Sequence, residues 1–276
     1  MRAPRILGRL GSGAKQRVTA WRAAHPSVIA WLRVLRLGLF QLGLGLSLAP
    51  LTGTLNRVLV AELSVPAGAV GLLLGIHFFV SPVRALIGFQ SDRKRAAGRW
   101  RTPYVVLGAM LTYGGLATAP FSLILLGAPD RIPFAVALPI CLAIFVVYGL
   151  GVNIVETMFL AVVSDITPRN ELGRTLAALW MMLVVGTIIG AFIVGQLLEN
   201  YTPDRLIGVM QGTAVAFVSS TFLALWGQER LRRDGTLATP SYGAQIRLSL
   251  PEAVRRLFRL PDLRTLMALL FVATAA

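Results

Sequence analysis

The sequence predicts an all-α protein that crosses a membrane several times. Of its 276 residues, 55% are hydrophobic and only 14% are charged. The mean hydropathy is +0.70. Apolar runs of about 20 residues, the length of helix that crosses the ~30 Å core of a bilayer, recur along the chain. One aqueous core cannot bury so much apolar surface, so a soluble domain is excluded and the lipid bilayer is an expected partner.

Six complete spans are expected, followed by the start of a seventh helix. Their approximate bounds are 35–60, 67–89, 103–126, 134–163, 172–198 and 206–226. The seventh run begins near residue 263, and the ~14 residues from there to Ala276 are too few to cross a bilayer. The expected parts are a basic N-terminal segment (1–34), a six-helix transmembrane bundle (35–228), a basic linker (229–262) and the start of a truncated second bundle (263–276).

Lysine and arginine residues fall almost entirely on one side of these spans. The termini and loops on the N-terminal side carry 23 of them, whereas the opposite loops carry only Arg57, Arg131 and Arg205. Because Lys and Arg are retained in the cytoplasm, the N-terminus is expected there. Membrane topology then accounts for the net charge of +15, and no nucleic-acid partner is expected.

The basic N-terminal segment has no small-residue cleavage site before the first apolar run. The first span is therefore expected to serve as an uncleaved signal anchor. Residues 27–36 mix apolar side chains with Arg33 and Arg36, as expected for a segment in the anionic membrane interface. For the residues before His25, a solvated basic tail is an equally good interpretation.

Polar side chains also occur near the far end of the first span. Thr52 and Asn56 are four residues apart and are expected to share a helical face. We assign them to helix packing, with the Arg57 side chain extending outward to the interface.

Two ionisable side chains are expected deep in the membrane. Arg84 lies eight residues before Asp92, and Glu156 lies nine residues before Asp165, which places both roughly 12–13 Å deep. Asn153 shares a helical face with Glu156. The matched depths predict an ion pair between the second and fourth spans, and we favour a structural pair over a ligand or proton site.

His77 is the only histidine expected at membrane depth. It lies seven residues before Arg84, two turns away on the same face of an uninterrupted helix. A histidine that is hydrogen-bonded to a neighbouring helix is the more common arrangement at such a position. A neutral imidazole is also a metal ligand, so a ligand-binding role stays open.

Two G-x-x-x-G spacings occur within the spans, as in many packed membrane helices. One joins Gly71 to Gly75, and the other joins Gly186 to Gly190. Both are expected to permit close helix approach, and neither indicates a particular function.

Two loops on the N-terminal side carry patterned residues. The loop after the second span contains Gly88, Asp92, Arg93, Gly98 and Arg101. Its Asp92 is expected to brace helix ends through charge-assisted hydrogen bonds. Its arginines are expected mainly to set topology, and the arginine cluster can also brace neighbouring helix ends. The loop after the fourth span contains Asp165, Pro168, Gly173 and Arg174, with Thr167 expected as a helix N-cap and Pro168 as the first helical residue. Both loops resemble signatures of the major facilitator superfamily. The resemblance implies an N-terminal six-helix bundle of a major-facilitator-like fold.

Several segments resemble a narrower group, the PucC-like family of photosynthetic bacteria. They are residues 35–41, 51–58 (LTGTLNRV), 82–92 and 149–153. The resemblance implies an assembly factor for light-harvesting complexes in the photosynthetic inner membrane. It also implies bacteriochlorophyll as a bound client, held by His77, Asn153 or Glu156. Light-harvesting subunits and pigment-synthesis enzymes would be its partners.

Two other function classes compete with this one. A secondary transporter would use Arg84 or Glu156 to couple solute or proton binding to alternating access. A prenyltransferase would need clustered carboxylates to hold Mg²⁺ and diphosphate, and the 12 acidic residues include no D-x-x-x-D group. With no catalytic residue and no metal ligand set to name, we expect a protein that is not an enzyme.

Overall fold

The computed structural model describes residues 26–96, 100–128, 130–230, 232–234 and 236–238, and positions 252, 255, 265 and 269. The N-terminal segment up to residue 25, Gly98, and most of the predicted linker and seventh helix lie outside the described residues.

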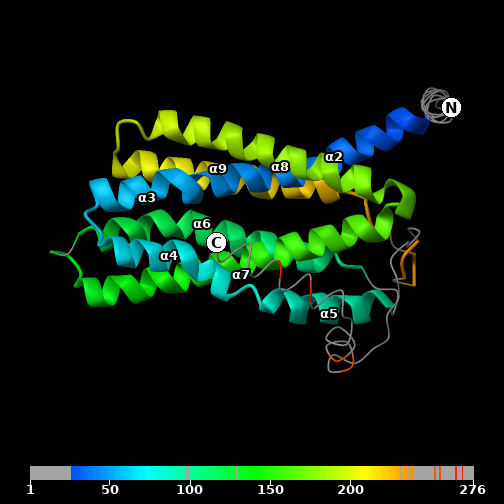
Figure 1. Cartoon of the computed structure of the whole chain (residues 1–276), viewed down its shortest axis with the longest axis horizontal. Helices are drawn as coiled ribbons and strands as arrows, with labels where there is room; N and C mark the ends of the chain where they lie inside the picture. The colour runs from blue at the N-terminus through cyan, green and yellow to red at the C-terminus, as the bar shows by residue number, and fades with distance from the viewer. Residues whose placement is uncertain are drawn as a thin grey trace, which may run out of the picture.

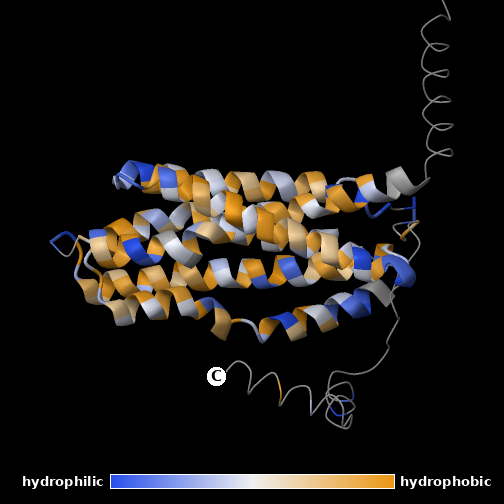
Figure 2. Cartoon of the chain, turned by 45° about the horizontal axis from the view of Figure 1, so that its top comes forward, coloured by the Kyte–Doolittle hydropathy of each residue, from blue (hydrophilic) through white to orange (hydrophobic). Residues whose placement is uncertain are grey.

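Every regular element in the described part of the chain is helical, as predicted. In chain order the elements are α2 (Pro26–Ala49), η1 (Pro50–Thr54), α3 (Leu55–Arg57), η2 (Val58–Glu62), α4 (Ala67–Phe79), α5 (Val83–Ala96), α6 (Thr102–Leu126), α7 (Phe134–Ile166), α8 (Arg169–Leu197) and α9 (Pro203–Leu225). Six stretches of these helices are long and apolar enough to cross a membrane, so the multi-pass prediction is confirmed. Figure 2 shows hydrophobic residues along the helices and hydrophilic residues gathered at their ends.

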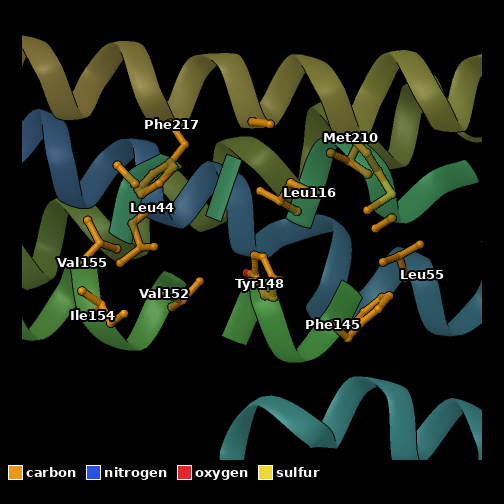
Figure 3. Packing of buried hydrophobic residues seen from close by; sticks show 14 of the residues in the cluster. Leu44, Leu55, Leu116, Phe145, Tyr148, Val152, Ile154, Val155, Met210 and Phe217 are labelled. Carbon is orange, nitrogen blue, oxygen red and sulfur yellow. The ribbon is translucent and has the colours of Figure 1, made fainter. Parts of the chain in front are cut away.

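The helices pack in two groups that run along the long axis of the molecule (Figure 1). In one group α7 packs on α6, α4 and α5, and in the other α2 packs on α8 and α9. Contacts between α6 and α9 join the groups, as does the Phe40 ring of α2, which stacks on Phe159 of α7 with 3.9 Å between ring centroids. Leu44, Val155 and Phe217 belong to the buried core between them (Figure 3).

Glycines set the closest helix approaches. A Cβ at Gly186 would overlap the backbone of Leu42, and one at Gly190 would lie 2.7 Å from the Cβ of Ala49, so the second G-x-x-x-G spacing packs α8 on α2. The first G-x-x-x-G spacing, from Gly71 to Gly75, makes no close helix contact with the described residues. No described atom lies within 4 Å of a Cβ at Gly71 or Gly75, because that face of α4 is turned away from α7.

The first span differs from its predicted bounds. The helix begins at Pro26, nine residues earlier than expected, because proline is well suited to the first turn of a helix. Its outer half contains two π-helical segments, η1 and η2. Pro50 has no N–H to donate to the previous turn, and the Leu55 N–H then bonds the Pro50 carbonyl, five residues back.

The second span is broken, which contradicts the prediction of one uninterrupted helix over 67–89. The α4 helix ends at Phe79 and α5 begins at Val83. Pro82 cannot donate to the Phe78 carbonyl four residues back, and its ring crowds that carbonyl. Ser81 satisfies the carbonyl instead, through its N–H at 3.1 Å and through its hydroxyl.

Helix boundaries also correct two loop predictions. The α5 helix continues to Ala96, so Asp92 and Arg93 are helical residues and not loop residues. The α8 helix begins at Arg169, with Pro168 in the N-cap position. The prediction of Thr167 as N-cap is therefore wrong by one residue, because Pro168 has an extended ψ of 144°. The other span boundaries agree with the prediction within three residues.

Candidate functional site

Four polar residues meet where α4 ends and α5 begins; we call His77, Arg84, Asn153 and Glu156 the intramembrane cluster. The Arg84 NH2 group lies 2.8 Å from Glu156 Oε2, so the ion pair inferred from matched depths is present. Arg84 Nε donates to Asn153 Oδ1. The Glu156 side chain is 14% exposed and that of Arg84 is 41% exposed, so the carboxylate is the more buried member of the pair.

The break between α4 and α5 leaves a backbone carbonyl to which Asn153 donates a hydrogen bond. The Ser81 N–H bonds to Phe78, so the His77 carbonyl loses its helical partner. Asn153 Nδ2 donates to that carbonyl at 3.3 Å and to the Gly149 carbonyl at 2.7 Å. Asn153 therefore contacts both sides of the break, α4 through His77 and α5 through Arg84.

The His77 imidazole is held in one orientation. Its Nδ1 lies 2.8 Å from the Leu74 carbonyl, which can only accept, so Nδ1 carries the proton in the neutral ring. Nε2 then carries the lone pair, as in a histidine oriented to bind a metal. His77 is half-buried. The Phe78 ring lies 3.9 Å from the imidazole between centroids, and Phe78 is 69% exposed.

The relation between His77 and Arg84 differs from the predicted one. They do not share a face of one helix, because the break at Pro82 separates them. Asn153 brings them together through their respective carbonyl and guanidinium. Close approach of α4 to α7 depends on Gly149, where a Cβ would lie 2.8 Å from His77 Cα.

Thr52 and Asn56 lie outside this cluster, in the outer half of the first span. The Thr52 side chain is not among the described ones, and Asn56 is exposed. The prediction that Thr52 and Asn56 share a helical face involves the Thr52 side chain and so lies outside the described side chains. The Arg57 side chain, which is 48% exposed, donates to the Leu198 carbonyl at the C-terminus of α8.

A second set of contacts, which we call the end network, joins helix ends on the N-terminal side of the membrane. Its centre is Arg101, whose side chain is 7% exposed. Arg101 lies 2.9 Å from Asp165 and 2.8 Å from Asp92, and it donates to the Ser91 hydroxyl at 2.8 Å. Arg101 therefore joins helix ends, the role expected of the arginine cluster in this loop.

Glu229 completes the end network by binding the N-terminus of α6. Its Oε2 accepts from the N–H groups of Arg101 and Thr102, both at 2.8 Å, and from the Thr102 hydroxyl at 2.7 Å. Sequence reasoning missed Ser91 and Glu229. The sequence signal that could have identified Glu229 is its position as an acidic residue at the start of a strongly basic tract.

The remaining patterned residues lie around these two sites. Gly88 faces Thr157 of α7 at 4.0 Å from a Cβ position. Arg93, Gly173 and Arg174 are exposed, and Pro168 is half-buried. Among the residues described, no group of three or more His, Cys, Asp or Glu side chains could hold a metal ion.

Comparison with known proteins identifies the family of this chain. The model of the PUCC protein family matches residues 54–276, which is most of the chain. The chain belongs to the PUCC family. That match includes all four residues of the intramembrane cluster and all those of the end network.

Relatives within this group come from photosynthetic bacteria. Protein PucC of Rhodobacter capsulatus is 40% identical over 206 residues, covering 73% of this chain and 45% of the relative. Protein PucC of Rhodovulum sulfidophilum is 37% identical over 250 residues, covering 88% and 54%. The bacteriochlorophyll synthase 44.5 kDa chain of Rhodobacter capsulatus is 31% identical over 252 residues, covering 90% and 55%. The chain thus spans about half the length of these PUCC relatives. No solved structure matches it significantly.

Proposed function

We propose that this protein assists the assembly of light-harvesting complexes by holding bacteriochlorophyll at the intramembrane cluster. The observation that carries the proposal is the His77 imidazole, whose Nδ1 is engaged by Leu74 while Nε2 makes no hydrogen bond to any described residue. A neutral imidazole with one nitrogen fixed is a suitable axial ligand for a magnesium tetrapyrrole.

The surroundings of His77 suit a large, mostly apolar pigment. The exposed Phe78 ring beside the imidazole offers an apolar surface for a macrocycle. Arg84 offers hydrogen-bond donors to peripheral oxygen atoms, and Asn153 fixes the backbone that carries both residues. When bound, the pigment would supply light absorption and its magnesium centre, while the protein binds, orients and releases it.

Family relationships support the same client. One relative is named as a chain of bacteriochlorophyll synthase, which ties the family to this pigment. We propose a carrier and not an enzyme for the present chain, because its polar residues form paired networks. We further propose a major-facilitator-like bundle in the photosynthetic inner membrane, with a cytoplasmic N-terminus and with light-harvesting subunits and pigment-synthesis enzymes as partners.

Pigment binding can be tested directly. The protein, extracted gently from a pigmented host, should carry a bacteriochlorophyll absorption band, and His77→Leu should diminish or shift that band. Phe192→Leu, on an exposed face of α8, is the matched control and should leave the band unchanged. Absence of pigment from the extracted protein, together with normal light-harvesting levels in a deletion strain, would refute the proposal.

One observation favours a second candidate function, transport of a small solute. Discontinuous membrane helices with polar groups at the break form the binding sites of many secondary transporters, and α4 and α5 meet in this way at Arg84. Solute flux into vesicles that is abolished by Arg84→Gln, without bound pigment, would support this alternative.

A further inference from the structure

Two arginines of α2 contact the C-terminal end of α9, on the N-terminal side of the membrane and away from the intramembrane cluster. Arg36 donates through NH2 to the carbonyl of Trp226, the C-cap of α9, at 2.8 Å. Arg33, one turn earlier, donates through Nε to Gln228 Oε1 at 3.3 Å. We call these four residues the α2–α9 junction. We propose that the junction binds the phosphate of an anionic phospholipid.

The positive charge of Arg36 is not balanced by any carboxylate in the described part of the chain. Its hydrogen bond there goes to a backbone carbonyl, whereas Arg84 has Glu156 as an ionic partner. The C-terminus of α9 supplies the equivalent of only about half a negative charge. The guanidinium is exposed and has five N–H groups, so several donors remain for an outside anion after the bond to Trp226.

Arg36 lies within the apolar band of α2 and not at its outer edge. Trp31, Leu32 and Leu35 precede it in the helix, and all three are exposed. Trp31 is about 7.5 Å further out along α2, and tryptophan is enriched where lipid meets water. The apolar surface therefore reaches outward past Arg36. An uncompensated charge at that depth is costly, so an anion that can enter the lipid boundary is favoured.

A lipid phosphate meets these requirements better than a free anion does. Its acyl chains can contact Leu32 and Leu35, on the part of α2 that diverges from the other helices in Figure 1, whereas inorganic phosphate gains nothing from them. The exposed Trp226 indole, whose N–H bonds to none of the described residues, offers a further donor. Arg33 adds a second positive charge, which disfavours the cation of a zwitterionic headgroup.

The test measures which lipids the purified full chain retains. The protein in detergent is incubated with equimolar phosphatidylglycerol and phosphatidylcholine that have identical acyl chains, and the bound lipids are counted by native mass spectrometry. The wild type should retain phosphatidylglycerol over phosphatidylcholine by about fivefold or more, the effect of one arginine near an anionic surface. Inorganic phosphate in large excess should not displace the phosphatidylglycerol, because it has no acyl chains.

Arg36→Gln is the decisive variant and should lower the ratio of the two retained lipids by about fivefold. Arg36→Lys keeps the charge and should keep most of the preference. Arg174→Gln removes an exposed positive charge from the same side of the membrane, near the start of α8, and is the matched control that should leave the ratio nearly unchanged.

A second variant covers the case in which Arg36→Gln fails to fold, because Arg36 also binds the end of α9. Trp226→Leu removes the indole and keeps the backbone carbonyl to which Arg36 donates. It should lower the ratio by about threefold, as expected for the loss of one hydrogen bond. Its melting temperature without added lipid should equal that of the wild type, since the exposed indole makes no hydrogen bond to the described residues.

The remaining outcomes would overturn the proposal. Equal losses for Arg36→Gln and Arg174→Gln would show that retention follows the overall charge and not this site. Displacement of phosphatidylglycerol by inorganic phosphate would show a site for a free anion. An unchanged ratio for Trp226→Leu together with an unchanged ratio for Arg36→Gln would exclude the junction. The lipids are counted in pigment-free protein, so the result is independent of the proposed pigment binding.

Discussion

Arg84 of α5 and Glu156 of α7 form an ion pair, 2.8 Å long, between residues 72 positions apart in the chain. Each lies two to three helical turns from the end network: α5 is continuous from Arg84 to Asp92, and α7 from Glu156 to Asp165. Two ionic contacts roughly 12–13 Å apart thus fix α5 against α7. The Arg84–Glu156 pair therefore holds α5, the second half of the broken span, against α7.

Removing one partner of this pair should destabilise the protein more than removing both. Arg84→Ala or Glu156→Ala leaves a charge at membrane depth, at a cost of about 3 kcal/mol, the lower end for a buried pair because Arg84 is partly exposed. The double variant should recover part of that loss. Thermal unfolding in detergent gives the free energies for a double-mutant cycle, and additive losses would contradict direct pairing.

The end network should depend on Arg101 and Asp165 more than on Asp92. The Asp165 side chain is 3% exposed, whereas that of Asp92 is 58% exposed, so solvent weakens the Asp92 contact. Arg101→Ala should cost about 3–5 kcal/mol and Asp92→Ala under about 1 kcal/mol. Arg93→Ala, on the exposed face of α5, serves as the control in the same unfolding measurement. Equal losses for Asp92→Ala and Asp165→Ala would show that burial does not govern this network.

Two buried polar side chains should be replaceable by apolar ones without loss. Gln41 is fully buried, and neither end of its amide finds a hydrogen-bond partner in the described structure; the same holds for the Tyr148 hydroxyl. Gln41→Leu should therefore raise the stability by about 1–3 kcal/mol, and Tyr148→Phe should be neutral or slightly stabilising. Both effects appear as changes in melting temperature. A lower melting temperature for Gln41→Leu would indicate that the amide has a partner in the protein's membrane environment.

Membrane orientation follows from the distribution of basic residues. Reporter tags at the N-terminus and within residues 235–249 should both be cytoplasmic, because 23 lysines and arginines lie on that side. A tag inserted after Asp130, between α6 and α7, provides the opposite control and should be periplasmic. A periplasmic signal from either of the first two tags would contradict the six-span topology.

The sequence by itself determined the helical class, the six spans and the matched depths of Arg84 and Glu156. These properties follow from local composition and from a fixed rise per residue, so no long-range contact is needed to infer them. The sequence also contained Pro82, but its position in an apolar run did not reveal that the second span would break. Prolines within α6 and α7 leave those helices continuous, which shows that the surroundings decide.

Only the tertiary structure decided which polar groups meet. The Arg101 side chain pairs with Asp165, 64 residues away in the chain, and the Arg101 N–H donates to Glu229, 128 residues away. No periodicity in the sequence encodes contacts over such separations. Asn153 bonds the His77 carbonyl only because the break leaves that carbonyl without a helical partner and because Gly149 lets α4 approach α7. A polar group at membrane depth is costly without a partner, and the packing of the helices determines which partner is within reach.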